Sequence, residues 1–225
     1  MPPNNDLLET ILMAGKYALS NLATLLVGGI VVALSFLVIG LPFFLGFVTR
    51  CMREIVRGNG VLPEWVEIGQ MFVDGIRMTL VFLAYAAVYA LIVLIPGIPV
   101  LVFSYTDMTF LLLISTILLV TTMAITAATL AFVFFASWVL YASTGSVRKA
   151  INIKKVIGFI LYNPEGFLVA IASSAAIAAI GVVAMTLVVS IPWAVFTISV
   201  AITFIYARFY QDTAKLQPRM VEWLR

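Results

Sequence analysis

The sequence predicts an all-α integral membrane protein, a polytopic bundle of transmembrane helices. Of its 225 residues, 64% are hydrophobic and 10% are charged, and the mean hydropathy is +1.17. A soluble domain has about a quarter of its residues charged and about half apolar. An apolar excess of this size needs an apolar solvent, which is a lipid bilayer.

The membrane segments follow from four uncharged stretches, residues 17–49, 78–106, 108–147 and 166–207. A helix needs about 20 residues to cross about 30 Å of hydrocarbon. The second stretch holds one crossing, which we expect to end at the helix breakers Pro96-Gly97-Ile98-Pro99. The third stretch predicts one long helix. The fourth is long enough for two helices, which Ser190-Ile191-Pro192-Trp193 divides.

The first stretch allows two interpretations, because glycine and proline interrupt it at Gly28-Gly29 and Gly40-Leu41-Pro42. One tilted, kinked crossing gives five crossings in all and an N-terminus outside. A shallow hairpin, entering over residues 16–36 and returning over residues 39–57, gives six membrane segments and an N-terminus inside. Both interpretations stay open on length alone.

The basic residues predict the orientation. Twelve of the 13 lysines and arginines lie in three segments, residues 46–77, residues 143–166 and the residues after 207. The predicted helices place these segments on one side of the membrane. The positive-inside rule assigns that side to the cytoplasm. We therefore expect a multi-pass protein of the cell membrane with a cytoplasmic C-terminus.

We expect one integral membrane domain over residues 1–225. Its parts are an N-terminal membrane hairpin (1–57), an interfacial helix with a helical hairpin (58–142), a second basic connection with a helical hairpin (143–207), and a cytoplasmic tail (208–225). The interfacial helix is predicted from an amphipathic pattern. Its apolar face holds Trp65, Ile68, Met71, Phe72 and Ile76, and its polar face holds Glu67, Gln70, Asp74 and Arg77.

The arginines before this helix are candidates for binding an anionic headgroup or a cytoplasmic partner. Arg50, Arg53 and Arg57 fall within about 60° on a helix that turns by about 100° per residue. Each basic residue near a membrane surface contributes about 1 kcal/mol of attraction to anionic lipid. The plainer interpretation is a topology determinant that touches lipid phosphates non-specifically. The full set of candidates is Arg50, Arg53, Arg57, Trp65, Arg148, Lys149, Lys154 and Lys155.

The third stretch carries hydroxyl side chains that fall within about 80° on a helical wheel. They are Ser115, Thr122, Thr126, Thr129 and Ser137. Such a stripe lines a path for water or a small polar solute in some proteins. In others the hydroxyls serve helix packing, because they bond to their own helix or to a neighbour.

Several chemistries lack their usual residues. The chain has no histidine and one cysteine, and we find no nucleophile beside a base, no phosphate-binding glycine loop and no metal-ligand spacing. The acidic residues Asp74, Glu64, Glu67 and Glu165 are interpreted as a solvated surface. We therefore predict no catalytic residue, no cofactor and no metal. Expected partners are anionic lipids, further copies of the chain or a larger membrane complex, and no nucleic acid.

One region resembles a known family. The matching elements are Gly46-Phe47-Val48-Thr49-Arg50, Arg53, Arg57-Gly58, Leu62-Pro63-Glu64-Trp65 and Phe72-Val73-Asp74-Gly75. With them the chain resembles a family of uncharacterised, largely archaeal multi-pass membrane proteins with an LPEW and DG signature. Through Ile95-Pro96-Gly97-Ile98 with Ser104-Tyr105, and through residues 206–210, it is more distantly similar to six-helix membrane domains such as that of glycerophosphodiester phosphodiesterases. The resemblance implies six segments with both ends cytoplasmic, and it implies no reaction.

These observations predict a non-enzymatic integral membrane protein that acts as a structural, lipid-binding or partner-organising module. The arginines, the amphipathic stretch and the lack of ionisable residues in the middle of any predicted crossing favour this function, because ion carriers usually keep such residues there. The alternative is a channel or carrier for a small neutral or lipophilic solute, favoured by the hydroxyl stripe and by the breaks at Pro42, Pro96 and Pro192.

Overall fold

The computed structural model describes residues 7–106, 108–186 and 190–224, and these residues form helices with no strand among them. The all-α prediction is confirmed. The helices are α1 (Leu7–Ala18), α2 (Leu22–Ser35), α3 (Leu41–Val56), α4 (Ile68–Ser104), α5 (Thr109–Thr144), α6 (Val147–Ile151), α7 (Ile153–Tyr162), α8 (Pro164–Ala184), α9 (Ile191–Leu216) and α10 (Pro218–Leu224).

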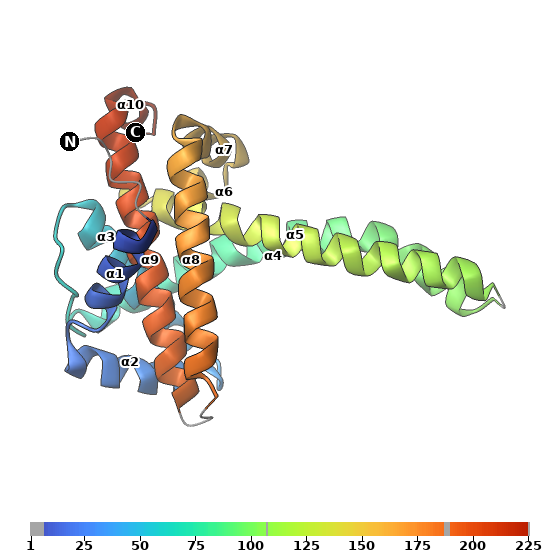
Figure 1. The fold of residues 1–225 in the computed structure, drawn as a ribbon, viewed down its shortest axis with the longest axis horizontal. Coiled ribbons are helices and arrows are strands. Elements are labelled where there is room, and N and C mark those ends of the chain that lie inside the picture. Colours follow the sequence, from blue (N-terminus) through green and yellow to red (C-terminus); the bar gives the residue numbers. More distant parts are fainter. Residues whose placement is uncertain (1–6, 107, 187–189, 225) are drawn as a thin grey trace.

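The molecule has two regions of very different packing. The helices α4 and α5 form a long hairpin, and we call its far part, residues 86–131, the arm. The other helices and the two near ends of this hairpin form the body. Figure 1 shows the arm, in green, extending sideways from the body and crosswise to α8 and α9. The two helix pairs, α4–α5 and α8–α9, therefore cannot both run parallel to the membrane normal. At least one of these pairs is tilted from it.

Four helices are long and apolar enough to cross a membrane, namely α4, α5, α8 and α9. A fifth span results if α1 and α2, which bend by 85° at their junction, are counted as one broken crossing. Six segments are more than the described residues supply, because α3 has 16 residues and reaches about 24 Å at 1.5 Å per residue. The alternative interpretation, five crossings, is the largest number of membrane spans that the described residues allow.

The N-terminal stretch breaks at one of the two places we expected, since α3 begins at Leu41 with Gly40 before it and Pro42 in its first turn, but it does not break at Gly28-Gly29. Helix α2 continues through Gly28 and Gly29, and its N-cap is Asn21, whose side chain accepts a hydrogen bond from the Thr24 amide at 3.0 Å. A Cβ atom on either glycine would overlap an aromatic ring of α9, Phe196 or Trp193. These glycines therefore allow close contact between α2 and α9 and do not kink the helix.

Helix α4 also continues where we expected it to end. Both Pro96 and Pro99 lie inside it, and it extends to Ser104. Proline removes one backbone hydrogen bond, but membrane helices tolerate it where neighbouring helices and local adjustments satisfy the freed carbonyl. The other two predicted boundaries are confirmed, since α5 is one long helix and α9 begins at Ile191 with Pro192 in its first turn.

The predicted interfacial helix is not a separate element. The residues from Ile68 to Arg77 form the first turns of α4 and continue into its apolar part. The exposed and buried sides also differ from the amphipathic pattern, because Ile68 and Phe72 are exposed whereas Asp74 is only 2% exposed. The pattern is misleading here because this part of α4 packs against α3 and α5 through polar as well as apolar side chains.

The second basic connection folds into the short helices α6 and α7 before the α8–α9 hairpin. Helix α9 does not stop at residue 207, where we placed the start of the tail. It continues to Leu216, and Phe209, Tyr210 and Thr213 are buried in this continuation. The first half of the expected cytoplasmic tail is therefore part of the folded body.

Candidate functional site

The candidate site lies where α3 meets the start of α4, and two glycines bring these helices together. A Cβ atom on Gly46 would overlap the backbone carbonyl of Met71, and one on Gly75 would overlap the backbone carbonyl of Pro42. Each helix thus uses a glycine to receive the backbone of the other. This contact sets the distance at which charged side chains of α3 reach α4.

An ion pair between Arg53 and Asp74 spans this contact. Arg53 Nη1 lies 2.7 Å from Asp74 Oδ2, and the two side chains are 18% and 3% exposed. The Tyr141 hydroxyl of α5 donates to Asp74 Oδ1 at 2.9 Å, and Gln70 Nε2 donates to Oδ2 at 3.4 Å. Burial lowers the pKa of Arg53, but the hydrogen bond and charge of Asp74 raise it above its ordinary value. The arginine therefore stays charged.

Two tryptophans fix the surroundings of this pair. The Trp65 ring stacks on Phe47 with a centroid separation of 4.1 Å, and its Nε1 donates to the Thr24 carbonyl at 3.1 Å. Trp138 Nε1 of α5 donates to Thr49 Oγ1 at 2.7 Å, and both residues are buried. Trp65, a predicted lipid or partner contact, is half-buried and packs within the body.

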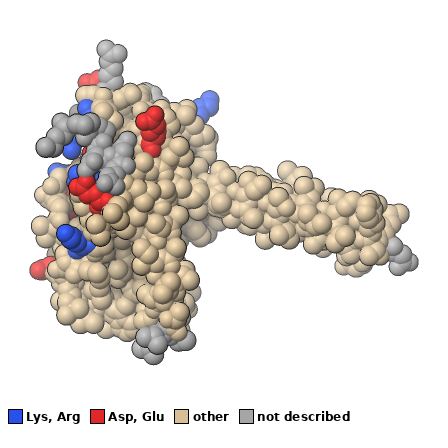
Figure 2. Space-filling view, viewed as in Figure 1, with Lys and Arg blue, Asp and Glu red and all other residues tan. Residues whose placement is uncertain are grey.

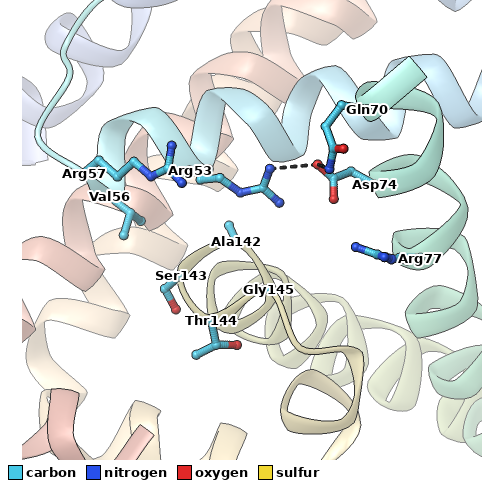
Figure 3. A pocket seen from close by; sticks show the side chains of 10 residues that line it. All are labelled: Arg53, Val56, Arg57, Gln70, Asp74, Arg77, Ala142, Ser143, Thr144 and Gly145. Atoms are coloured by element: carbon cyan, nitrogen blue, oxygen red, sulfur yellow. Dashed lines mark hydrogen bonds and ion pairs between the residues drawn. The ribbon is translucent and has the colours of Figure 1, made fainter. Parts of the chain in front are cut away.

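A cavity of about 300 Å³ opens beside the ion pair (Figure 3). Its lining comes from α3, from the first turns of α4 and from the C-terminal end of α5. Figure 3 shows the side chains of Arg53 and Arg57 on one wall and Arg77 on another, with Asp74 between them. The full lining is Arg53, Val56, Arg57, Gln70, Asp74, Arg77, Ala142, Ser143, Thr144 and Gly145.

The cavity carries an excess of positive charge, because three arginines face a single carboxylate. A smaller cavity of about 100 Å³ adjoins it and is balanced. There Arg50 pairs with Glu67 at 3.3 Å and Arg57 pairs with Glu54 at 3.3 Å. The charges lining the smaller cavity are Arg50, Arg53 and Arg57 against Glu54, Glu67 and Asp74. Over the two linings together four arginines face three carboxylates, and the excess charge is that of Arg77, which lines the larger cavity.

The other predicted basic residues lie elsewhere. Arg148 and Lys149 are in α6, Lys154 and Lys155 are in α7, and none of them lines either of these two cavities. Arg148 and Lys154 are exposed, whereas Lys149 and Lys155 are half-buried. The structure thus brings together Arg50, Arg53 and Arg57 of the predicted set and adds Arg77.

The hydroxyl side chains of α5 are found in three settings. Ser115 and Thr129 donate to carbonyls of their own helix, those of Leu112 at 3.0 Å and Ile125 at 2.9 Å. Ser137 is buried and donates across to the Ala150 carbonyl of α6 at 2.6 Å. Thr122 and Thr126 are half-buried on the arm.

Sequence reasoning missed Asp74, Arg77 and Tyr141 as parts of the site. The interpretation of Asp74 as a solvated acidic residue is wrong, because the carboxylate is buried and paired. One signal was present, since Asp74 belongs to the DG element of the family resemblance. Nothing in the sequence marked Tyr141, which is 67 positions away from Asp74.

The arrangement is suited to holding an anion. Guanidinium groups bind phosphate and carboxylate groups through paired N–H donors. Among the residues that the structure describes, no group of three or more His, Cys, Asp or Glu side chains could hold a metal ion. Two further cavities, of about 300 and 390 Å³, lie between α4 and α5 and between α1, α8 and α9, and apolar side chains dominate both.

Comparison with known proteins places the chain in one family. No curated protein and no solved structure matches the chain. The sequence profile of one family, described as "Protein of unknown function (DUF4013)", matches residues 30–193, a range that includes α3, the site and the arm. The chain therefore belongs to this family of proteins of unknown function, in which it is a multi-pass helical membrane protein.

Proposed function

We propose that the protein is a non-enzymatic integral membrane module that binds anionic lipid headgroups at the cytoplasmic face of the cell membrane and organises partners within the membrane. The observation that carries this proposal is the separation of charge between the two regions. The described residues of the arm carry no Lys, Arg, Asp or Glu, whereas the body carries all described basic residues. Figure 2 shows this contrast on one face of the molecule.

The orientation is part of the proposal. Positive charge stays on the cytoplasmic side of membrane proteins, so the body's basic helix ends and the C-terminus are assigned to that side. Anionic lipids are concentrated in the cytoplasmic leaflet and attract basic residues near its surface. The exposed cations Arg57, Arg148 and Lys154 would then meet lipid headgroups.

The hydroxyl, thiol and carboxyl side chains on α3, α4 and α5 near this junction support a non-enzymatic function. The hydroxyls of Ser143 and Thr144 both donate to the Leu140 carbonyl, at 3.1 and 2.6 Å, and not to a base. Cys51 is fully buried, and burial raises the pKa of its thiol, which disfavours the nucleophilic thiolate. The carboxylate of Asp74 is occupied by Arg53 and Tyr141.

The test is lipid retention. The protein is purified from its membrane in mild detergent, and the phospholipids that remain bound are counted by mass spectrometry. We expect anionic phospholipid to be enriched over its share of the membrane. The combined change Arg57→Gln, Arg148→Gln and Lys154→Gln should reduce this enrichment, because it removes exposed cations. An unchanged lipid composition would reject the lipid-binding part of the proposal.

A second assay addresses the transport alternative. The protein is reconstituted in liposomes, and uptake of small neutral solutes is measured. Solute-selective uptake that disappears when Thr122 and Thr126 become valine would favour a carrier over the proposed module. We expect no uptake above that of protein-free liposomes.

A further inference from the structure

We propose that the larger cavity at the junction of α3, α4 and α5 is a specific site for one phosphate group, bound mainly by Arg57 and Arg77. This inference rests on the proposed function and deepens it, because it replaces general attraction to a membrane surface with one defined site. The phosphate comes either from the headgroup of a phospholipid or from a free anion, and the experiment below separates the two sources.

The first argument is charge. The cavity is lined by Arg53, Arg57 and Arg77 against Asp74 alone, whereas charges in the adjoining cavity are equal in number. The C-terminal end of α5 also faces the cavity through Gly145 and carries partial negative charge, equivalent to about half an elementary charge. The arginines that line the cavity outnumber its carboxylate by two, and still by one when Glu54, the ion-pair partner of Arg57, is counted. This excess is larger than the partial charge of the helix end, so the cavity attracts an anion.

The second argument is the availability of donors. Arg53 is committed to Asp74, whereas the ion-pair partner of Arg57 among the described residues is Glu54, at 3.3 Å, and the Arg57 side chain is 63% exposed. An exposed pair of this kind contributes little stability and exchanges readily. Arg77 is exposed, and none of the ion pairs found among the described residues includes it. It interacts with the Tyr141 hydroxyl, which leaves most of the five N–H donors of its guanidinium group. Both guanidinium groups thus have N–H donors for a phosphate oxygen.

The third argument is position. Arg77 is the last charged residue before the uncharged stretch 78–106 of α4, and the cavity also touches the last residues of α5. The cavity therefore lies at the level where charged surface gives way to apolar surface. In a membrane this is the level of the lipid headgroups. A phospholipid phosphate would reach the cavity with its acyl chains beside the hairpin.

Arg53 has a different part in the site. Its guanidinium holds Asp74, and Tyr141 holds the same carboxylate from the other side. This network joins α3, α4 and α5 around the cavity. Because Arg53 neutralises the charge of Asp74, this carboxylate repels a bound anion less than an unpaired one would. Arg53 is therefore a positioning residue, and Arg57 and Arg77 are the binding residues.

The experiment compares two double variants with the same loss of charge. One is Arg57→Gln with Arg77→Gln, in the cavity, and the control is Arg148→Gln with Lys154→Gln, on exposed positions outside it. Each is placed in nanodiscs of phosphatidylcholine alone, and of phosphatidylcholine and phosphatidylglycerol in equal parts. Native mass spectrometry then counts the phosphatidylglycerol molecules retained per chain, and circular dichroism checks that each variant is folded.

We expect the wild type and the control to retain one phosphatidylglycerol per chain, and the cavity variant to bind it at least about tenfold more weakly. If the cavity variant is unfolded, Arg57→Lys with Arg77→Lys replaces it, because lysine keeps the charge and loses the paired donors. This variant should also bind more weakly than the wild type. Inorganic phosphate added to the phosphatidylcholine nanodiscs tests the free anion, which would raise the melting temperature of the wild type and leave that of the cavity variant unchanged.

Three results would overturn the inference. Equal weakening in both double variants would show general surface attraction, which keeps the proposed function and rejects the cavity. Unchanged retention in a folded cavity variant would place the phosphate elsewhere. Retention of neither phosphatidylglycerol nor inorganic phosphate by the wild type would reject the cavity site and the lipid-binding function together.

Discussion

The body and the arm are both rich in apolar side chains but have opposite packing. In the body the largest buried side chains include Tyr141, Tyr206, Phe47 and Phe159. In the arm only Pro96 and Ser115 are buried among the described residues. Apolar side chains thus do two different tasks in one chain, since those of the body bind protein and those of the arm are left for lipid or a neighbour. The difference teaches that polar contacts, not apolar content, mark where this membrane protein packs on itself.

The polar contacts gather where the arm joins the body. Asp74, Trp138 and Ser137 each bond to a residue of another helix, namely Arg53, Thr49 and Ala150. On the arm the corresponding hydroxyl, that of Thr129, donates to the Ile125 carbonyl of its own helix and to no other helix among the described residues. In a bilayer an unsatisfied polar group costs several kcal/mol, so these bonds hold the hairpin at one place on the body.

The largest expected effect is on membrane topology, that is, on which positions of the body and the arm can be labelled from outside the cell. Single cysteines replace Arg57 or Lys154 in the body, Met108 at the arm tip, or Thr186 near the α8–α9 turn, and a membrane-impermeant maleimide is added to intact cells. Cys51 is buried and serves as the unreactive background. Positions 108 and 186 should react at once, and positions 57 and 154 only after permeabilisation. Reaction of 57 and 108 from the same side would show that the arm does not cross the membrane.

The next effect is on stability. Asp74→Asn removes one partner of the buried ion pair and leaves Arg53 without its counter-charge. Breaking such a pair costs about 3–5 kcal/mol of unfolding free energy. Denaturant unfolding in detergent measures it. Glu54→Gln breaks the exposed pair with Arg57 and should cost less than about 1 kcal/mol. Equal costs for the two variants would contradict the buried network.

A pair of glycine substitutions compares the regions directly. Gly75→Ala introduces a methyl group that overlaps the Pro42 backbone, and such overpacking costs about 1–3 kcal/mol. Gly97→Ala lies in the arm with nothing within 4 Å of the new methyl group, and it should stabilise α4 by up to about 1 kcal/mol because alanine favours helix. The two melting temperatures should move in opposite directions. A destabilised Gly97→Ala would mean that another chain or helix covers the arm.

The smallest effect concerns the hydroxyls of α5. Ser137→Ala removes the donor to the Ala150 carbonyl, which Tyr85 also contacts at 3.2 Å. The expected loss is about 0.5–1.5 kcal/mol. Thr129→Val on the arm removes only a bond to its own helix and should leave the unfolding free energy within about 0.5 kcal/mol of the wild type. Thermal unfolding of both variants in one detergent measures the difference.

Part of the site could be predicted before the structure. The spacing of Arg50, Arg53 and Arg57 placed them on one side of a helix, and they do lie at one place on α3. The family resemblance singled out Gly46, Asp74 and Gly75, and the structure gives the reason, since they form the contact and the ion pair between α3 and α4. The amphipathic pattern predicted the wrong environment for Asp74. A carboxylate that is buried against a partner far away in the sequence occupies the same position on a helical wheel as a carboxylate exposed to solvent.

The sequence by itself determined that the chain is helical, that it resides in a membrane and that twelve of its 13 basic residues lie in three segments. These follow from composition and from runs of uncharged residues, which report the preferred solvent. Only the tertiary structure decided which apolar surfaces meet protein, that α4 continues through Pro96 and Pro99, and that Arg53, Arg57 and Arg77 surround one cavity. The physical reason is that a lipid chain and a leucine side chain are equally apolar, so hydropathy cannot distinguish a helix packed on protein from a helix packed on lipid.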